Sequence, residues 1–291
     1  MVFADFLSVV RRRLARPVPL VRYLFLTTET HALCGALAFF AMIAFYPVSL
    51  LLVSLAKHVL RSPAALEVVR LALQSYYPAG QEFLLRNLEV SSRLSGDALS
   101  LHGALWILLG GAGVFIPLEM AFNRLWRFPE HRPYWSNQLV GLALTLAWWA
   151  LAVTLFLALA GLPAVVRVVL LPVGVVVGGA VAIFLVYRFL PHGRVPTAAA
   201  LPAAALTVVT AEVVRWLFAL VLPLLRLPHS QGPFHVSVSF LVFIYVEAFV
   251  LLGGAYLAAE ATRARAASAR MVSPPETPIS LSGSPSPPRT G

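Results

Sequence analysis

The chain has 291 residues, of which 59% are hydrophobic and 12% are charged, and its mean hydropathy is +0.84. These values exclude a soluble globular enzyme, because soluble domains contain roughly 45–50% apolar and about 25% charged residues and need polar side chains to cover their surface. They also exclude a disordered chain, which requires low hydrophobicity. The composition therefore predicts a membrane protein with several spans.

The net charge is +10, and Lys57 is the only lysine among the basic residues. In a soluble protein such an excess would indicate nucleic-acid binding. Here the arginines lie between apolar runs, as the positive-inside rule describes, so no nucleic-acid partner is expected. The single cysteine, Cys34, cannot form an intramolecular disulfide or a multi-cysteine metal site. The sequence has no Walker, dinucleotide-binding or HExxH motif, and we predict no cofactor and no metal.

Six apolar stretches have at least the length of roughly 20 residues that a transmembrane helix needs. We therefore predict an all-α, polytopic membrane protein with six transmembrane helices in one domain over residues 30–261. The predicted spans are 32–56, 103–122, 137–161, 168–187, 198–225 and 234–259.

The charges of the loops predict the orientation. With the N-terminus inside, thirteen basic residues fall on the cytoplasmic side and seven on the outer side. Both termini are then cytoplasmic, as a basic arm over 1–29 and a Pro- and Ser-rich tail over 262–291, which we expect to be disordered. Within the arm, Phe3–Leu14 alternates apolar and basic residues, a pattern typical of a helix that lies in the membrane interface.

The segment 57–102 is the only long outer loop. An amphipathic helix is expected over Pro63–Ser75 and a second helical stretch around Gln81–Leu94, separated by a turn. Two interpretations stay open: the loop caps the bundle or lies on the outer membrane surface, or it is a plain connection.

Ionisable residues inside the predicted spans are the candidates for function. A charge at membrane depth costs at least about 2.5–3.5 kcal/mol, so it normally faces the bundle interior and has a partner. Glu119, Glu212, Arg215 and Glu247 meet this description. They predict either a polar pathway for an ion, a proton or a polar headgroup, or a structural network that pairs Glu212 with Arg215 and Glu119 with Arg124.

Small residues mark places where helices approach closely. Gly174 and Gly178 form a GxxxG pattern in the fourth span, and Gly110 and Gly113 lie in the second span above Pro117. Such glycines serve packing in most membrane proteins, and the pattern is compatible with contacts inside one bundle or between two copies. In transporters, broken helices with this composition can also line binding sites.

Several motifs resemble the YihY/BrkB family of bacterial inner-membrane proteins. They are Leu118-Glu119-Met-Ala-Phe-Asn123-Arg124-Leu-Trp126, Arg132-Pro133-Tyr-Trp135, Tyr187-Arg188-Phe189-Leu190-Pro191 and Ala200-Leu201-Pro202. The resemblance extends over about Thr30–Ala261 and adds Asn123 and Arg124 to the candidate residues. Near the end of the last span the family usually has G-A-E, where this chain has Gly254-Ala255-Tyr256.

The resemblance implies a multi-pass protein of the bacterial inner membrane with a poorly defined, transport-like role. We expect the lipid bilayer as its partner, and lipid headgroups or a small ion as candidate further partners. The family also carries the name ribonuclease BN, but such a nuclease needs a His- and Asp-rich metal cluster to activate water, and the sequence has none. We therefore expect a non-enzymatic transporter or channel-like protein for a small ion or an amphiphile. The alternative is a membrane-organising or lipid-handling factor that acts through the outer amphipathic loop.

Overall fold

The structure is a computed structural model that describes residues 2–54, 61, 63, 66–68, 70–71, 101–128, 133–225 and 235–272. Within these residues every regular element is a helix and there is no strand, which confirms the all-α prediction. The elements are α1 (Val2–Ala15), α2 (Val18–Phe25), α3 (Thr28–Ser54), α6 (Leu101–Trp126), α7 (Tyr134–Ala160), α8 (Ala164–Phe189), α9 (Thr197–Val221), the 3-10 helix η2 (Leu222–Leu225) and α11 (His235–Val272).

Five of these helices are long and apolar enough to cross a membrane. The segments are Thr28–Phe45, Gln138–Leu159, Val165–Phe189, Thr197–Leu224 and His235–Ala267. Each overlaps one predicted span, and together they indicate a polytopic membrane protein. Among the described residues α6 is not one of these five, although it has 26 residues, as many as α8.

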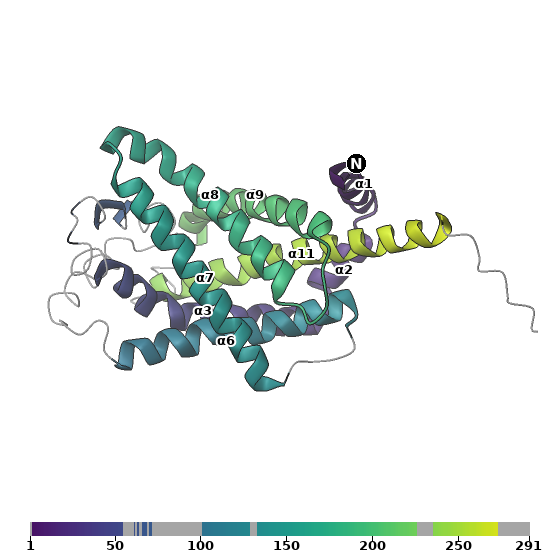
Figure 1. Cartoon of the computed structure of the whole chain (residues 1–291), viewed down its shortest axis with the longest axis horizontal. Helices are drawn as coiled ribbons and strands as arrows, with labels where there is room; N and C mark the ends of the chain where they lie inside the picture. The colour runs from purple at the N-terminus through teal and green to yellow at the C-terminus, as the bar shows by residue number, and fades with distance from the viewer. Residues whose placement is uncertain are drawn as a thin grey trace, which may run out of the picture.

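The α11 helix packs against α9 and α3 and, less extensively, against α6 (Figure 1). The α3 helix packs most extensively against α6, and α9 lies between α8 and α11. The α7 helix joins α6 to α8 and exposes large apolar side chains, such as Leu139 and Leu146, as a lipid-facing helix does.

The α11 helix is much longer than a bilayer requires. Its 38 residues extend about 57 Å at 1.5 Å per residue, nearly twice the roughly 30 Å of the hydrocarbon core. In Figure 1 its C-terminal end projects beyond the other long helices, on the side of the bundle where α1 and α2 lie.

The N-terminal segment is helical, as expected, and one face of it packs against the bundle. The α1 helix buries Phe6 and Val9 in the main apolar core and contacts α9 and α11. Pro17 then separates α1 from α2, which exposes Val18 and Phe25 instead. The apolar face of α1 thus serves packing within the protein, because the projecting end of α11 offers it a surface.

The predicted outer loop, 57–102, lies mainly outside the described residues, as does the tail beyond residue 272. One described residue of the loop, Val68, is 2% exposed. It clusters with Leu159, Leu171, Val236 and Phe240 near the end of α7 and the starts of α8 and α11. At this position the loop packs onto the bundle.

Candidate functional site

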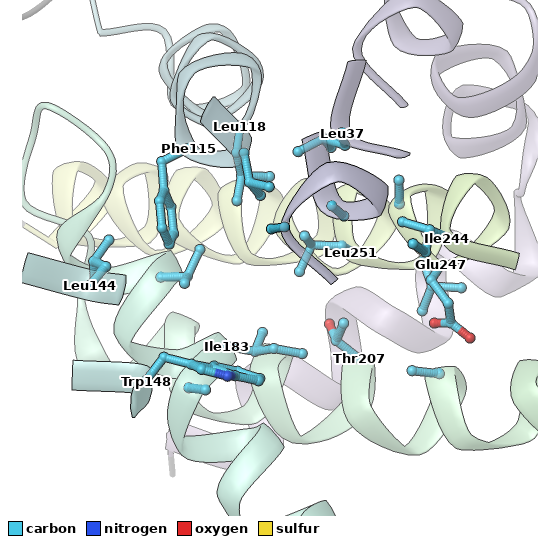
Figure 2. A pocket seen from close by; sticks show the side chains of 18 of the residues that line it. Leu37, Phe115, Leu118, Leu144, Trp148, Ile183, Thr207, Ile244, Glu247 and Leu251 are labelled. Carbon is cyan, nitrogen blue, oxygen red and sulfur yellow. The ribbon is translucent and has the colours of Figure 1, made fainter. Parts of the chain in front are cut away.

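A cavity of about 520 Å³ lies among six helices, α3, α6, α7, α8, α9 and α11. Figure 2 shows aliphatic and aromatic side chains around it, among them Phe115, Leu144 and Ile183. Its size is within the range of small-molecule sites. Only three of its lining residues have a hydroxyl or carboxyl group, namely Thr145, Thr207 and Glu247.

The two threonine hydroxyls are engaged by their own helices. Thr145 donates to the carbonyl oxygen of Gly141 at 2.8 Å, and Thr207 donates to that of Ala203 at 2.7 Å. Such bonds to the preceding turn are common for Thr inside helices. They leave these hydroxyls without a proton to donate into the cavity.

Glu247 differs from both threonines. Its Oε1 atom is buried and has no hydrogen-bond partner among the described residues. In Figure 2 the side chain extends from α11 toward the helix that carries Thr207. Because a buried acceptor without a donor costs free energy, it calls for an explanation. Glu247 therefore places a carboxylate in the cavity wall whose Oε1 atom no described residue satisfies.

Glu212 and Arg215 form a bidentate ion pair on α9. Both Nε and Nη2 of Arg215 donate to Oε2 of Glu212, at 2.9 and 2.8 Å. The i, i+3 spacing places the two side chains on one face of the helix. Neither residue lines the cavity, but both charges act electrostatically on Glu247.

Glu119 and Asn123 lie buried on α6, away from the cavity lining. The side-chain amide of Asn123 donates to Oε1 of Glu119 at 3.4 Å, while its Oδ1 accepts the backbone N–H of His192 at 2.8 Å. The anticipated pair of Glu119 with Arg124 is replaced by a pair of Arg124 with the exposed Glu29. The reason is helical geometry, since Arg124 is on the exposed side of α6.

The three intramembrane carboxylates thus do not converge on one space. Only Glu247 faces the cavity, Glu212 is paired, and Glu119 belongs to a network within the core. No group of three or more metal-ligating side chains that could hold an ion occurs in the described part of the chain.

Three of the four highlighted glycines meet aromatic or aliphatic side chains of neighbouring helices. A Cβ atom at Gly113 would overlap Phe40 of α3, and one at Gly174 would lie 2.6 Å from a methyl carbon of Leu155 on α7. At Gly178 the nearest atom of Leu155 would be 3.8 Å away, which is ordinary contact. The side-chain surroundings of Gly110 lie outside the described residues.

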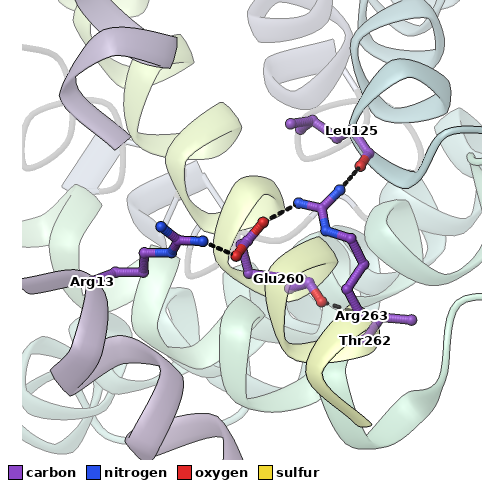
Figure 3. Close-up of polar contacts among 6 residues, drawn as sticks. Arg13, Leu125, Glu260, Thr262 and Arg263 are labelled. Carbon is purple, nitrogen blue, oxygen red and sulfur yellow. Dashed lines mark hydrogen bonds and ion pairs between the residues drawn. The ribbon is translucent and has the colours of Figure 1, made fainter. Parts of the chain in front are cut away.

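A fourth polar cluster was not expected from the sequence. Glu260, beyond the predicted last span, accepts hydrogen bonds from Arg13 of α1 and Arg263 of α11 (Figure 3). Arg263 also donates to the carbonyl oxygen of Leu125 at 2.9 Å. The bond to Glu260 raises the pKa of Arg13 above its usual value. The Glu260–Arg263 spacing is visible in the sequence, but Arg13 is 247 positions away.

The motifs that resembled a known family meet in space. Phe122 packs edge-on against Tyr187, with ring centroids 5.5 Å apart, and Asn123 binds the backbone at His192, just after the Tyr187–Pro191 motif. Arg188 of that motif donates to the carbonyl oxygen of Val195 at 2.7 Å. The motif residues therefore hold α6, α8 and the turn before α9 together.

Comparison with known proteins agrees with these motifs. The sequence model of the family described as virulence factor BrkB matches residues 24–277. No curated protein and no solved structure matches the chain. The match includes the whole helical bundle from α3 to α11 and most of the chain. This chain belongs to the YihY/BrkB family.

Proposed function

We propose that this protein is a non-enzymatic transporter of the bacterial inner membrane that moves an amphiphile through its helical bundle. The observation that carries the proposal is the cavity of about 520 Å³ with a single carboxylate, Glu247, in an otherwise apolar wall. An amphiphile matches such a wall, because its chain takes the apolar surface and its polar group takes the carboxylate.

A small ion was the other substrate class suggested by the sequence, and the geometry favours it less. Ions lose most of their hydration shell in a narrow site and need several oxygen ligands in return. Among the described lining residues, only the Glu247 carboxylate and two threonine hydroxyls provide such oxygen atoms. The two hydroxyls already donate to the carbonyl oxygens of Gly141 and Ala203.

The alternative function, a lipid-handling factor that acts through the outer loop 57–102, lacks comparable support. The buried Val68 packs onto the helix ends and is not available to a partner. Deletion of residues 62–94 tests this alternative: loss of a co-purifying lipid or protein would favour it, and unchanged co-purification would count against it.

Transport is tested with purified protein in liposomes that contain a fluorescent single-chain amphiphile. A membrane-impermeant quencher then reports movement between leaflets. The wild-type protein should accelerate movement over empty liposomes, and Glu247→Gln should slow it. Glu29→Gln is the matched control, because Glu29 lies outside the cavity lining and pairs with Arg124. Movement at the empty-liposome rate for cationic, neutral and anionic amphiphiles and for ions would refute transport.

We also propose six spans with both termini cytoplasmic, with α6 as the sixth span. Five spans would place the termini on opposite sides of the membrane, and six would place them on the same side. The locations of the two termini therefore distinguish five spans from six. Cys34 is fully buried, so its thiol should not react with a labelling reagent and should not obscure the signal of an introduced cysteine. With an impermeant maleimide on intact spheroplasts, Ser230→Cys should react, while Arg16→Cys and Ser273→Cys should react only after lysis. Labelling of Ser273→Cys without lysis would exclude this topology.

A further inference from the structure

We infer that the ligand of the cavity is an amine-bearing amphiphile, whose ammonium group pairs with the carboxylate of Glu247 while its apolar chain lies along the opposite wall. This inference rests on the proposed function for its place in transport, but the binding site itself stands on the geometry of the cavity. The ammonium chemistry could come from an aminophospholipid or from a free long-chain amine.

The charge of the ligand follows from the partners that Glu247 lacks. Its Oε1 atom is buried without a hydrogen bond, and its only described cationic neighbour, Arg215, directs Nε and Nη2 to Glu212. A carboxylate in an apolar wall needs a compensating donor, and a cationic donor forms the strongest bond with it. An anionic headgroup would instead be repelled by Glu247 and Glu212.

The number of polar groups sets the shape of the ligand. The lining residues provide one carboxylate, whereas the remaining wall is almost entirely aliphatic or aromatic. A compact hydrated cation would exchange its water shell for too few oxygen ligands. An ammonium on an apolar chain needs only one strong acceptor, and its chain is stabilised by about 25 cal/mol for each Å² of apolar surface removed from water.

The arrangement of the wall gives the ligand a direction. In Figure 2, Glu247 lies on one side of the cavity, whereas Leu144 and Trp148 of α7 lie on the other. The polar end is therefore between α11 and α9, and the chain extends toward α7. Because a carboxylate accepts hydrogen bonds from N–H groups, a primary ammonium fits better than a quaternary one, which has none.

The binding test uses the full chain in nanodiscs of choline phospholipid, with radiolabelled dodecylammonium as the probe and scintillation proximity as the readout. Unlabelled dodecylammonium should compete at least about tenfold better than dodecanol or dodecyltrimethylammonium, because a hydrogen bond to a charged group contributes that much to affinity. Dodecyl sulfate should not compete. Equal competition by dodecanol and dodecylammonium would overturn the inference.

Variants at the carboxylate separate recognition from folding. Glu247→Gln should lower the affinity for dodecylammonium by about tenfold or more and leave that for dodecanol unchanged. Glu247→Asp, which keeps the charge, should restore most of the affinity. Glu29→Gln should behave as the wild type, since Glu29 does not line the cavity and pairs with Arg124. Equal binding by wild type and Glu247→Gln, with both monodisperse, would contradict the site.

Nanodiscs made with ethanolamine phospholipid distinguish the two sources of the amine. Weaker dodecylammonium binding in these discs assigns the site to an aminophospholipid, and unchanged binding assigns it to a free amine. Binding without movement in the liposome assay would retain the site and refute transport. If an amphiphile moves at the same rate with the wild type and with Glu247→Gln, and no amine binding is detected, transport would be retained and the site refuted.

Discussion

The hydroxyl of Tyr187 on α8 lies 3.0 Å from the hydroxyl of Thr207 on α9. The same phenol donates to the carbonyl oxygen of Leu251 on α11 at 2.7 Å. Both side chains are buried, and Gly254 of α11 lies directly against them. Three helices therefore meet at one point, where the absence of a side chain on α11 leaves space for two hydroxyl groups.

Gly254→Ala should destabilise the bundle. The added Cβ would lie 2.5 Å from the Tyr187 hydroxyl and would overlap the Thr207 hydroxyl. Overpacking of this kind costs about 1–3 kcal/mol. We expect a lower thermal unfolding midpoint in detergent, measured by the loss of the monodisperse peak after heating.

The neighbouring glycine provides the control. At Gly253 a Cβ would lie 3.5 Å from a methyl carbon of Leu24, which is ordinary contact. Gly253→Ala should be neutral or slightly stabilising, because Ala has the higher helix propensity. An unfolding midpoint of Gly254→Ala equal to that of Gly253→Ala would show that the three-helix contact is not tight.

Tyr187→Phe should relieve part of the clash in Gly254→Ala. Alone, it removes the bond to Leu251 and costs about 1 kcal/mol, while the ring keeps its edge-on contact with Phe122. In the double variant one of the two overlapping hydroxyls is gone. Its loss of unfolding free energy should therefore be smaller than the sum of the losses in the two single variants. Strict additivity of the unfolding free energies would contradict a shared contact.

Much of this architecture can be predicted from the sequence because apolar runs and helical spacing are local signals. The spacing of Glu212 and Arg215 already places them on one face, and their ion pair lies entirely within α9. The contacts of Asn123 with His192 and of Glu260 with Arg13 join positions 69 and 247 residues apart. No local pattern encodes such contacts.

The cavity is hidden from the sequence for a related reason. Its wall combines single faces of six helices, and each face has the same apolar composition as a lipid-facing surface. The sequence marks Glu247 as an unusual charge, but the absence of a partner for its Oε1 depends on the rotation of α9 and α11.

Asn123→Ala should destabilise the turn between α8 and α9. It would leave the backbone N–H of His192 without the acceptor that Oδ1 provides, in a site where Asn123 is 1% exposed. An unsatisfied group of this kind costs about 1–3 kcal/mol. Hydrogen exchange by mass spectrometry should show faster exchange over residues 190–196.

Thr210→Ala is a suitable control for Asn123→Ala, because Thr210 is exposed and donates only to Leu206 of its own helix. Its exchange pattern should match the wild type. Unchanged exchange over 190–196 in Asn123→Ala would show that the side chain does not hold the turn.

Glu260→Gln should loosen the attachment of α1 to the bundle. Glu260 is 19% exposed at its side chain and accepts bonds from two arginines, Arg13 and Arg263, so its charge is engaged twice (Figure 3). Glu29→Gln is the matched control, because Glu29 and its partner Arg124 are 64% and 50% exposed. Exposed pairs contribute about 0–1 kcal/mol, whereas removal of one member of a more buried pair leaves uncompensated charge and costs more. We expect faster hydrogen exchange across Val2–Ala15 in Glu260→Gln and no change in Glu29→Gln.

The burial of Phe6 and Val9 should keep α1 helical in both variants. Equal exchange of α1 in the two variants would mean that apolar packing alone fixes this helix.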